Sequence, residues 1–192
     1  MSSAVSRLVT LAPLAGSSIA KQALLVVGGS LFLAGMSQVA VGYPVPTTLQ
    51  TLGVMLIGLT FGFRLAVATV GLYLLEGALG LPVYAQFSGG FAKLVGPTGG
   101  YLVGFLVAAA AIGYMADRGV TKSWVGAIGA LIVGEAIIMG LGVAWLSKFM
   151  PSFAETVAVG FTPFVLVDAI KIALAALIGK GVLKGAAQFA KL

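Results

Sequence analysis

Six stretches of the chain are apolar over most of their length, and shorter segments with charges, glycine or proline separate them. These stretches cover residues 18–41, 47–61, 65–79, 99–116, 123–146 and 163–183. About 20 apolar residues are needed for a helix to cross the hydrocarbon core of a bilayer, and a helix satisfies its backbone hydrogen bonds there internally. The pattern therefore predicts an all-α integral membrane protein with six transmembrane helices. The second and third helices are short, so their ends are the least defined.

The segment before Ser18 contains Arg7 followed by "LVTLAPLAG", which superficially resembles a signal peptide. Its apolar run is short and is broken by Pro13. We therefore expect residues 1–17 to form a retained N-terminal tail or a short interfacial segment. Residues 18–192 are then a single six-helix transmembrane domain.

Composition supports a membrane protein and excludes several kinds of site. Hydrophobic residues make up 60% of the chain and charged residues 8%, and the mean hydropathy is +1.14. A soluble domain of this size cannot bury so much apolar surface. Cysteine and histidine are absent, which removes disulfides, thiolate metal sites and the commonest general base. No metal site and no cofactor are expected.

Enzymatic activity is also not expected from this chain. It contains no GxxxxGK[ST] segment for ATP hydrolysis, and serine hydrolases and zinc proteases both need the missing histidine. An intramembrane aspartyl protease needs two membrane aspartates, whereas only Asp168 lies in an apolar stretch. The net charge of +6 comes from scattered single residues, so it does not indicate a nucleic-acid surface.

The basic residues predict the orientation of the six helices, because cytoplasmic loops are enriched in Lys and Arg. If the N-terminus is inside, eight of these residues are cytoplasmic: Arg7, Lys21, Arg64, Arg118, Lys122, Lys180, Lys184 and Lys191. Only Lys93 and Lys148 are then outside, and Lys171 lies within the sixth helix. We therefore expect both termini to be cytoplasmic and the protein to lie in the plasma membrane.

On this topology the long connections 80–98 and 147–162 are outside, together with "GYPVP" after the first helix. The stretch "GLPVYAQFSGGFAKLVGPTGGY" has too much glycine and proline for a spanning helix, yet it carries several aromatic residues. Two interpretations stay open. The stretch either folds back as a cap over a cavity, or covers the bundle with its aromatic residues at the membrane interface.

Two charges, Asp168 and Lys171, lie inside the apolar stretch "FVLVDAIKIAL". Each costs roughly 2.5 to 3.5 kcal/mol at the centre of a membrane helix, so both are expected to have a purpose. Their spacing of three residues places them on one helix face, about 8 to 12 Å below the outer surface. They form either an internal ion pair that packs the bundle or a polar face that recognises a ligand.

Four segments in this order and spacing resemble the BioY family, the biotin-binding S components of energy-coupling factor (ECF) transporters: "YPVPTTLQTLGVMLIG", "GALGLPVYAQFSGG", "LVGPTGGYLVGF" and "PFVLVDAIK". The resemblance extends from about Gly42 to Ala175. It implies a six-helix vitamin-binding membrane protein that assembles with a transmembrane T component and two cytoplasmic ATPase subunits.

The resemblance also implies a site in which Asp168 and Lys171 hold the ureido head of biotin. This ring offers two N–H donors and a carbonyl acceptor, which a carboxylate and an ammonium complement. Gln86 is a further polar partner, although the longer Gln in place of Asn would change the geometry. The aromatic rings expected to pack on biotin are Tyr84, Phe87 and Tyr101. Gly89 and Gly90 are expected to let backbone amides approach it, and the expected polar lining is Thr47, Gln50 and Thr51.

Alternatives stay open for several of these residues. The threonines before the second helix can be helix caps, with Gln50 bonded to a neighbouring helix. Lys93 is either the partner of the biotin carboxylate or a solvated lysine. Ser30 and Ala34 have the small-xxx-small spacing that can dock a T component, or they pack internally against the sixth or third helix.

Other functions compete with biotin binding in an ECF transporter. The chain can be an S component for another vitamin, or a structural membrane protein. It can also be a stand-alone ion-coupled carrier in which Asp168, Lys171 and Glu135 form a relay, although the two halves of the chain lack convincing similarity. Glu135, in the middle of the fifth helix, has no role assigned by the resemblance.

Overall fold

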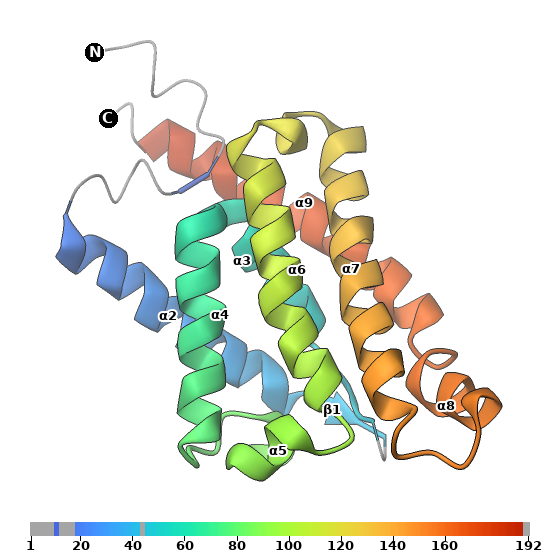
Figure 1. Ribbon diagram of the computed structural model, residues 1–192. Helices are drawn as coiled ribbons and strands as arrows, with labels where there is room; N and C mark the ends of the chain where they lie inside the picture. Colours follow the sequence, from blue (N-terminus) through green and yellow to red (C-terminus); the bar gives the residue numbers. More distant parts are fainter. Residues whose placement is uncertain (1–9, 12–17, 43–44, 190–192) are drawn as a thin grey trace.

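The computed structural model describes residues 10–11, 18–42 and 45–189, and this part of the chain is mostly helical (Figure 1). The long helices are α2 (Ile19–Gln38), α3 (Gln50–Phe61), α4 (Phe63–Ala78), α6 (Gly99–Asp117), α7 (Trp124–Leu146) and α9 (Val165–Phe189). Short helical elements are η2 (Ala85–Phe87), α5 (Phe91–Val95), η3 (Val120–Lys122) and α8 (Phe153–Gly160). An antiparallel hairpin pairs β1 (Ala40–Val41) with β2 (Thr47–Thr48).

Each of the six predicted helices corresponds to one long helix. Among the described residues, three of them are long and apolar enough to cross a membrane, namely α2, α6 and α7. A fourth span is added if α8 and α9, which meet at an angle of 43°, count as one. The predicted N-terminal tail lies mostly outside the described residues, but the Leu11 amide donates a hydrogen bond to the Thr60 carbonyl at 2.6 Å.

The prediction was wrong between α2 and α3. The first helix ends at Gln38 instead of residue 41, and the second begins at Gln50 instead of Thr47. Val41 pairs with Thr47 in the intervening hairpin. The chain reverses direction here, and strand pairing gives its backbone groups hydrogen-bond partners at the reversal. β-branched residues such as Val and Thr also favour strands over helices.

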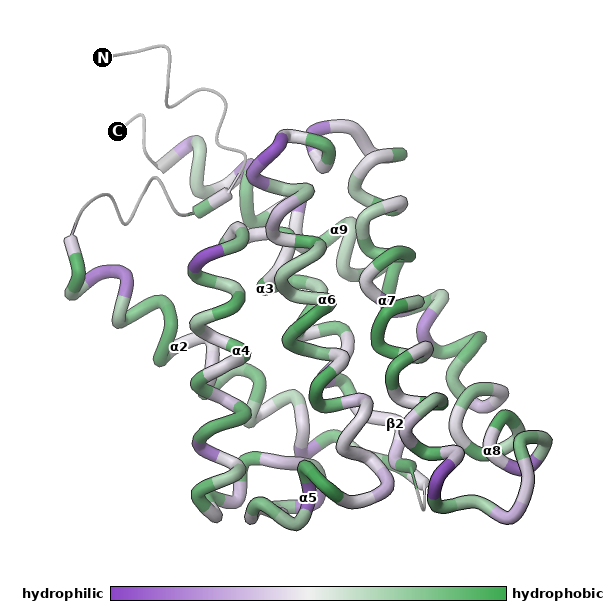
Figure 2. The backbone as a smooth tube through the Cα atoms, in the orientation of Figure 1, coloured by the Kyte–Doolittle hydropathy of each residue, from purple (hydrophilic) through white to green (hydrophobic). Residues whose placement is uncertain are grey.

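Helix α6 lies in the middle of the molecule and packs against α3, α4 and α7, while α9 crosses against α3 and α7 (Figure 1). Glycines permit close helix approach: a Cβ on Gly142 of α7 would lie 2.2 Å from the Tyr101 ring of α6. Residues 51–60 of α3 are all buried. Figure 2 shows hydrophobic residues along most of the helices, and the exposed ones include Leu24, Val125 and Leu166.

The two ends of the bundle differ. The start of α2, the connection from α6 to α7 and the last turns of α9 lie at the upper end in Figure 1. The hairpin, α5 and α8 lie at the lower end. There the segment between α4 and α6 folds back on the bundle, since the Tyr84 hydroxyl donates to the Leu74 carbonyl of α4 at 2.7 Å. Trp145 of α7 likewise donates to the Gly96 carbonyl at 2.9 Å.

Candidate functional site

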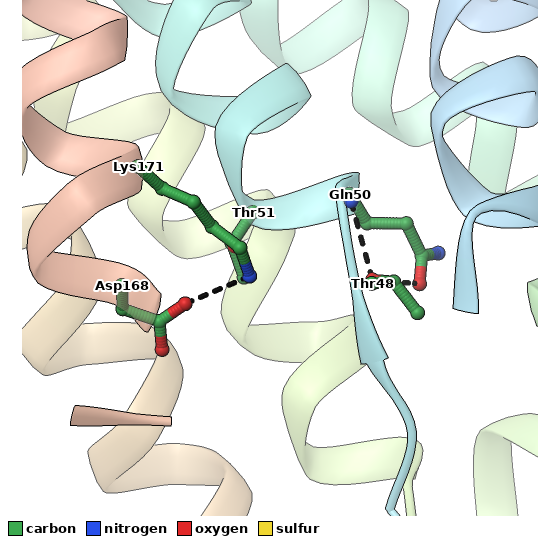
Figure 3. A network of polar contacts seen from close by, with 5 residues as sticks. All are labelled: Thr48, Gln50, Thr51, Asp168 and Lys171. Carbon is green, nitrogen blue, oxygen red and sulfur yellow. Dashed lines mark hydrogen bonds and ion pairs between the residues drawn. The ribbon is translucent and has the colours of Figure 1, made fainter. Parts of the chain in front are cut away.

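Asp168 and Lys171 form a buried ion pair on α9 (Figure 3). The Lys171 Nζ lies 2.8 Å from Oδ1 of Asp168 and 3.0 Å from the Thr51 hydroxyl of α3. Both charged residues are only 3% exposed. The predicted common face is therefore confirmed, and Asp168 also lies in the first turn of α9, where the helix dipole favours a negative charge.

The pair is incompletely balanced. Oδ2 of Asp168 is buried, and no described residue bonds to it. Glu135 of α7 is buried too, and neither of its carboxylate oxygens has a hydrogen-bond partner among the described residues. Its charged neighbours are Asp168 and Lys171. The structure thus brings together two carboxylates and one ammonium, and buried polar atoms without partners are uncommon enough to indicate a functional site.

A cavity adjoins this pair at the lower end of the bundle. Lys171 contributes to its wall, whereas Asp168 is not one of its lining residues. The wall combines aromatic, aliphatic and polar side chains from six parts of the chain, as is common for sites of small organic ligands. Its lining residues are Gly42, Val45, Pro46, Thr48, Gln50, Thr51, Tyr84, Ala85, Gln86, Ser88, Lys93, Thr98, Tyr101, Leu102, Phe105, Met139, Phe164 and Lys171.

The start of α3 supplies polar lining, with one change from the prediction. The Gln50 side chain accepts a hydrogen bond from the Thr48 hydroxyl at 2.9 Å and donates one to the Tyr73 hydroxyl at 2.6 Å. Thr47 was expected in the site but does not line this cavity, whereas Thr48 does. Successive strand residues point to opposite sides, so only one of the two threonines can face the cavity.

The connection between α4 and α6 covers part of the cavity. Tyr84 is 3% exposed, and burial raises the pKa of its phenol to about 12, so the hydroxyl stays protonated as a donor. Its ring meets Tyr73 edge to face, with 5.5 Å between centroids. Gln86 and Lys93 are exposed side chains that also line the cavity. This arrangement agrees with the cap interpretation of the segment.

Gly89 and Gly90, the two glycines of this segment that were expected near the ligand, do not line the cavity. The Gly90 amide donates to the Gly77 carbonyl at 2.7 Å, so it is already used within the protein. A Cβ on Gly89 would lie 2.3 Å from the Leu81 carbonyl oxygen. Gly89 therefore serves close packing of the segment, whereas Gly90 has open space around it and a φ of 97°, a conformation that favours glycine. The bonded Gly90 amide contradicts the expectation that it approaches the ligand.

Tyr101 lies in the cavity wall as expected, and its hydroxyl donates to the Gly160 carbonyl of α8 at 2.7 Å. The sequence analysis missed three other large lining residues: Phe105, Met139 and Phe164. Each lies four residues from a residue that it did single out. Since helical residues four apart share a face, this spacing was a usable signal.

The predicted subunit contact is not on the surface. Ser30 is fully buried, and its hydroxyl donates to the Glu76 carboxylate of α4. Ala34 is partly buried against the main hydrophobic core. Ser30 therefore packs internally against α4, the third of the predicted helices, which agrees with the alternative left open by the sequence. Docking of a T component through Ala34 stays a prediction.

Several known proteins resemble this chain in sequence and fold. A model of the BioY family matches residues 5–188. Biotin transporter BioY of Thermotoga maritima is 44% identical over 135 residues, covering 70% of this chain and 79% of the relative. Biotin transporter BioY2 of Lactococcus lactis subsp. cremoris is 34% identical over 162 residues, covering 83% and 88% of the two chains.

A crystal structure of the S-component for biotin from an ECF-type ABC transporter has the same fold. Its TM-score is 0.78 at 26% sequence identity, and the match covers 88% of this chain and 94% of that chain. The family model spans most of the sequence, including all the residues that line the cavity. The chain belongs to the BioY family.

Proposed function

We propose that this chain is the biotin-binding membrane subunit of an ECF-type uptake transporter. It captures biotin at the outer side of the plasma membrane for ATP-driven import with a T component and two ATPase subunits. The observation that carries this proposal is the buried Asp168–Lys171 pair beside a capped cavity in a chain of the BioY family.

The chemistry of the cavity suits biotin. Its ureido ring presents donors and an acceptor without net charge, so it can bond to a charged pair without burying a third charge. Thr51 and Gln50 add neutral polar groups on the α3 side. Tyr84, Tyr101 and the neighbouring aromatic residues provide apolar surface for the thioether ring. Lys93 is a cation at the rim for the carboxylate of the tail.

Six membrane spans are part of the proposal, namely α2, α3, α4, α6, α7 and α9. Helix α3 has 12 residues, about 18 Å, which is shorter than the hydrocarbon core. Because α3 is surrounded by protein, the non-helical backbone before it can lie at membrane depth beside the cavity. Strand β2 and helix α3 then form one span together.

Charge supports an outward-facing cavity with both termini inside. Most of the described basic residues belong to elements at the end opposite the cavity: Lys21, Arg64, Arg118, Lys122, Lys180 and Lys184. Lys180 donates to the Lys122 carbonyl at 2.6 Å, so α9 ends on the same side as the connection from α6 to α7. Of the other described basic residues, Lys93 and Lys148 belong to segments at the cavity end, and Lys171 is buried in the cavity wall.

Binding is tested first on the purified protein in detergent. Calorimetry should give one biotin per chain without ATP or other subunits, with nanomolar affinity or about 12 kcal/mol. Riboflavin and thiamine are the comparison ligands, each at the same concentration. Thermal stabilisation by either of them but not by biotin would overturn the assignment in favour of another vitamin.

Partnership is tested separately. The chain is expressed with and without a T component and the two ATPases, and uptake of radiolabelled biotin is measured. We expect ATP-dependent uptake only with the complete set. Equal uptake by the chain alone, abolished by an ionophore, would replace the proposal with an ion-coupled carrier.

A further inference from the structure

The cap over the cavity contains a strained turn at η2. Gln86 has φ 59° and ψ 39°, and Phe87 has φ 53°. They are the two non-glycine residues with positive φ in the described part of the chain. Left-handed backbone is unfavourable for residues with large side chains, and two in succession persist only where surrounding contacts hold them. Gln86 lines the cavity, so the strain lies where a ligand would be contacted.

The turn has its own hydrogen bonds between Tyr84, Ala85 and Ser88, and the contacts that reach it from outside the segment come from Gln38, the last residue of α2. Its Oε1 accepts the Phe87 amide at 2.8 Å, and its Nε2 lies 3.3 Å from the Tyr84 carbonyl oxygen. One side chain thus bonds to both sides of Gln86. Nε2 also lies 3.0 Å from the Ala34 carbonyl oxygen, within its own helix. The amide end of the side chain is therefore held by its own helix as well as by the turn.

The neighbouring Ser37 strengthens the same connection. Its hydroxyl donates to the Val83 carbonyl at 2.6 Å, and it lies 2.7 Å from Nε2 of Gln38. Val83 also accepts from the Tyr73 hydroxyl at 3.1 Å, and Tyr73 is bonded to the cavity residue Gln50. The last turn of α2 thereby joins the cap to the polar lining at the start of α3.

We propose that Gln38 is a positioning residue for ligand recognition, which holds the strained turn so that the Gln86 amide faces the cavity. Gln38 does not line the cavity itself. It acts through the backbone of the turn by keeping Gln86 and Phe87 in the left-handed region. This inference rests on the proposed function, because biotin is the ligand used to measure it.

The first test measures biotin affinity and melting temperature for Gln38→Ala and Gln38→Glu. Two lost hydrogen bonds should weaken biotin binding by roughly 10-fold to 100-fold in Gln38→Ala, and the melting temperature should fall as well, because the same bonds stabilise the folded chain. Gln38→Glu keeps the acceptor for the Phe87 amide but places its other carboxylate oxygen opposite the Ala34 and Tyr84 carbonyl oxygens, so its affinity should be no higher than that of Gln38→Ala. Gln188→Ala is the matched control, an exposed glutamine near the end of α9.

A rescue variant separates positioning from general stability. Asn tolerates the left-handed region better than Phe, and Phe87 is 72% exposed and does not line the cavity. Adding Phe87→Asn to Gln38→Ala should therefore recover most of the lost affinity. If Gln38→Ala binds biotin like the original chain, or if its loss is not recovered by Phe87→Asn, the inference is wrong.

A ligand-free measurement distinguishes this inference from the proposed function. The chain has no cysteine, so Phe87→Cys gives a single attachment site for a spin label. Gln38→Ala should increase the mobility of this label without biotin, and Gln188→Ala should not. Increased mobility in a protein that does not bind biotin would refute the proposed function but retain the positioning role. Unchanged mobility would refute the positioning role even if biotin binds.

Discussion

The buried pair on α9 permits a double-mutant cycle that decides whether it recognises biotin or only packs the bundle. Asp168→Asn keeps the shape of the side chain and removes its charge, and Lys171→Met keeps the apolar stem without the ammonium. The double variant removes both charges. Lys184→Met is the control, because Lys184 is an exposed lysine on the same helix.

The size of each effect follows from the charges around the pair. At 2.8 Å the attraction is about 6 kcal/mol for an effective dielectric constant of 20, and removing one partner of a buried pair destabilises by about 3 to 5 kcal/mol. In Asp168→Asn, the ammonium retains the Thr51 hydroxyl and the nearby Glu135 carboxylate. In Lys171→Met, two carboxylates lose their only cation among the described neighbours. Lys171→Met should therefore be the less stable single variant.

Both melting temperature and biotin affinity are measured for the four proteins of the cycle. If the pair recognises biotin, each single variant loses roughly 2 to 4 kcal/mol of binding, or about 30-fold to 900-fold in Kd. The double variant should then recover part of the stability but not the affinity, because neither charge of the pair is left isolated, while Glu135 still lacks its cation. A stable double variant that binds biotin as tightly as the original chain would refute the recognition role.

Three further substitutions test other parts of the site. Glu135→Gln should raise the melting temperature, because it removes one of two neighbouring carboxylates and the new amide can donate to Oδ2 of Asp168. A lower melting temperature would contradict this account. Tyr84→Phe should lower the free energy of unfolding by about 1 kcal/mol and leave calorimetric biotin affinity unchanged, because the hydroxyl bonds to a backbone carbonyl of α4. Gly142→Ala should destabilise the protein in thermal melts and weaken biotin binding by forcing the Tyr101 ring to move, whereas Gly140→Ala, with open space around it, should do neither.

Hydropathy located the helices and the buried charges because both depend on the residue types themselves. An apolar run predicts a membrane helix wherever it packs, and a charge within that run is conspicuous without knowledge of its neighbours. Asp168 and Lys171 could be paired from sequence because both belong to one helix. That Glu135 lies beside this pair could not be predicted from the sequence, because it depends on how α7 packs against α9.

The short strands and the hydrogen bonds between distant parts of the chain could not be predicted from hydropathy. The strands have two residues each, too few to show an alternating pattern, so the chain from Thr47 to Thr48 was assigned to a helix and the wrong threonine was placed in the site. Gln38 bonds to backbone groups 46 and 49 residues away. Such bonds require only a side-chain amide at the correct place. The residue types of the turn therefore do not indicate that Gln38 is its partner.

Some of the missing lining was nevertheless present in the helical spacing. Glu135, Met139 and Gly142 lie at positions i, i+4 and i+7 of α7, so they share one face. Their contacts follow in that order: Glu135 adjoins the charged pair, Met139 lines the cavity, and Gly142 leaves room for the Tyr101 ring. One unexplained buried charge therefore indicates a whole helix face. Following that face by one and two turns would have found the α7 wall of the cavity before any coordinates were known.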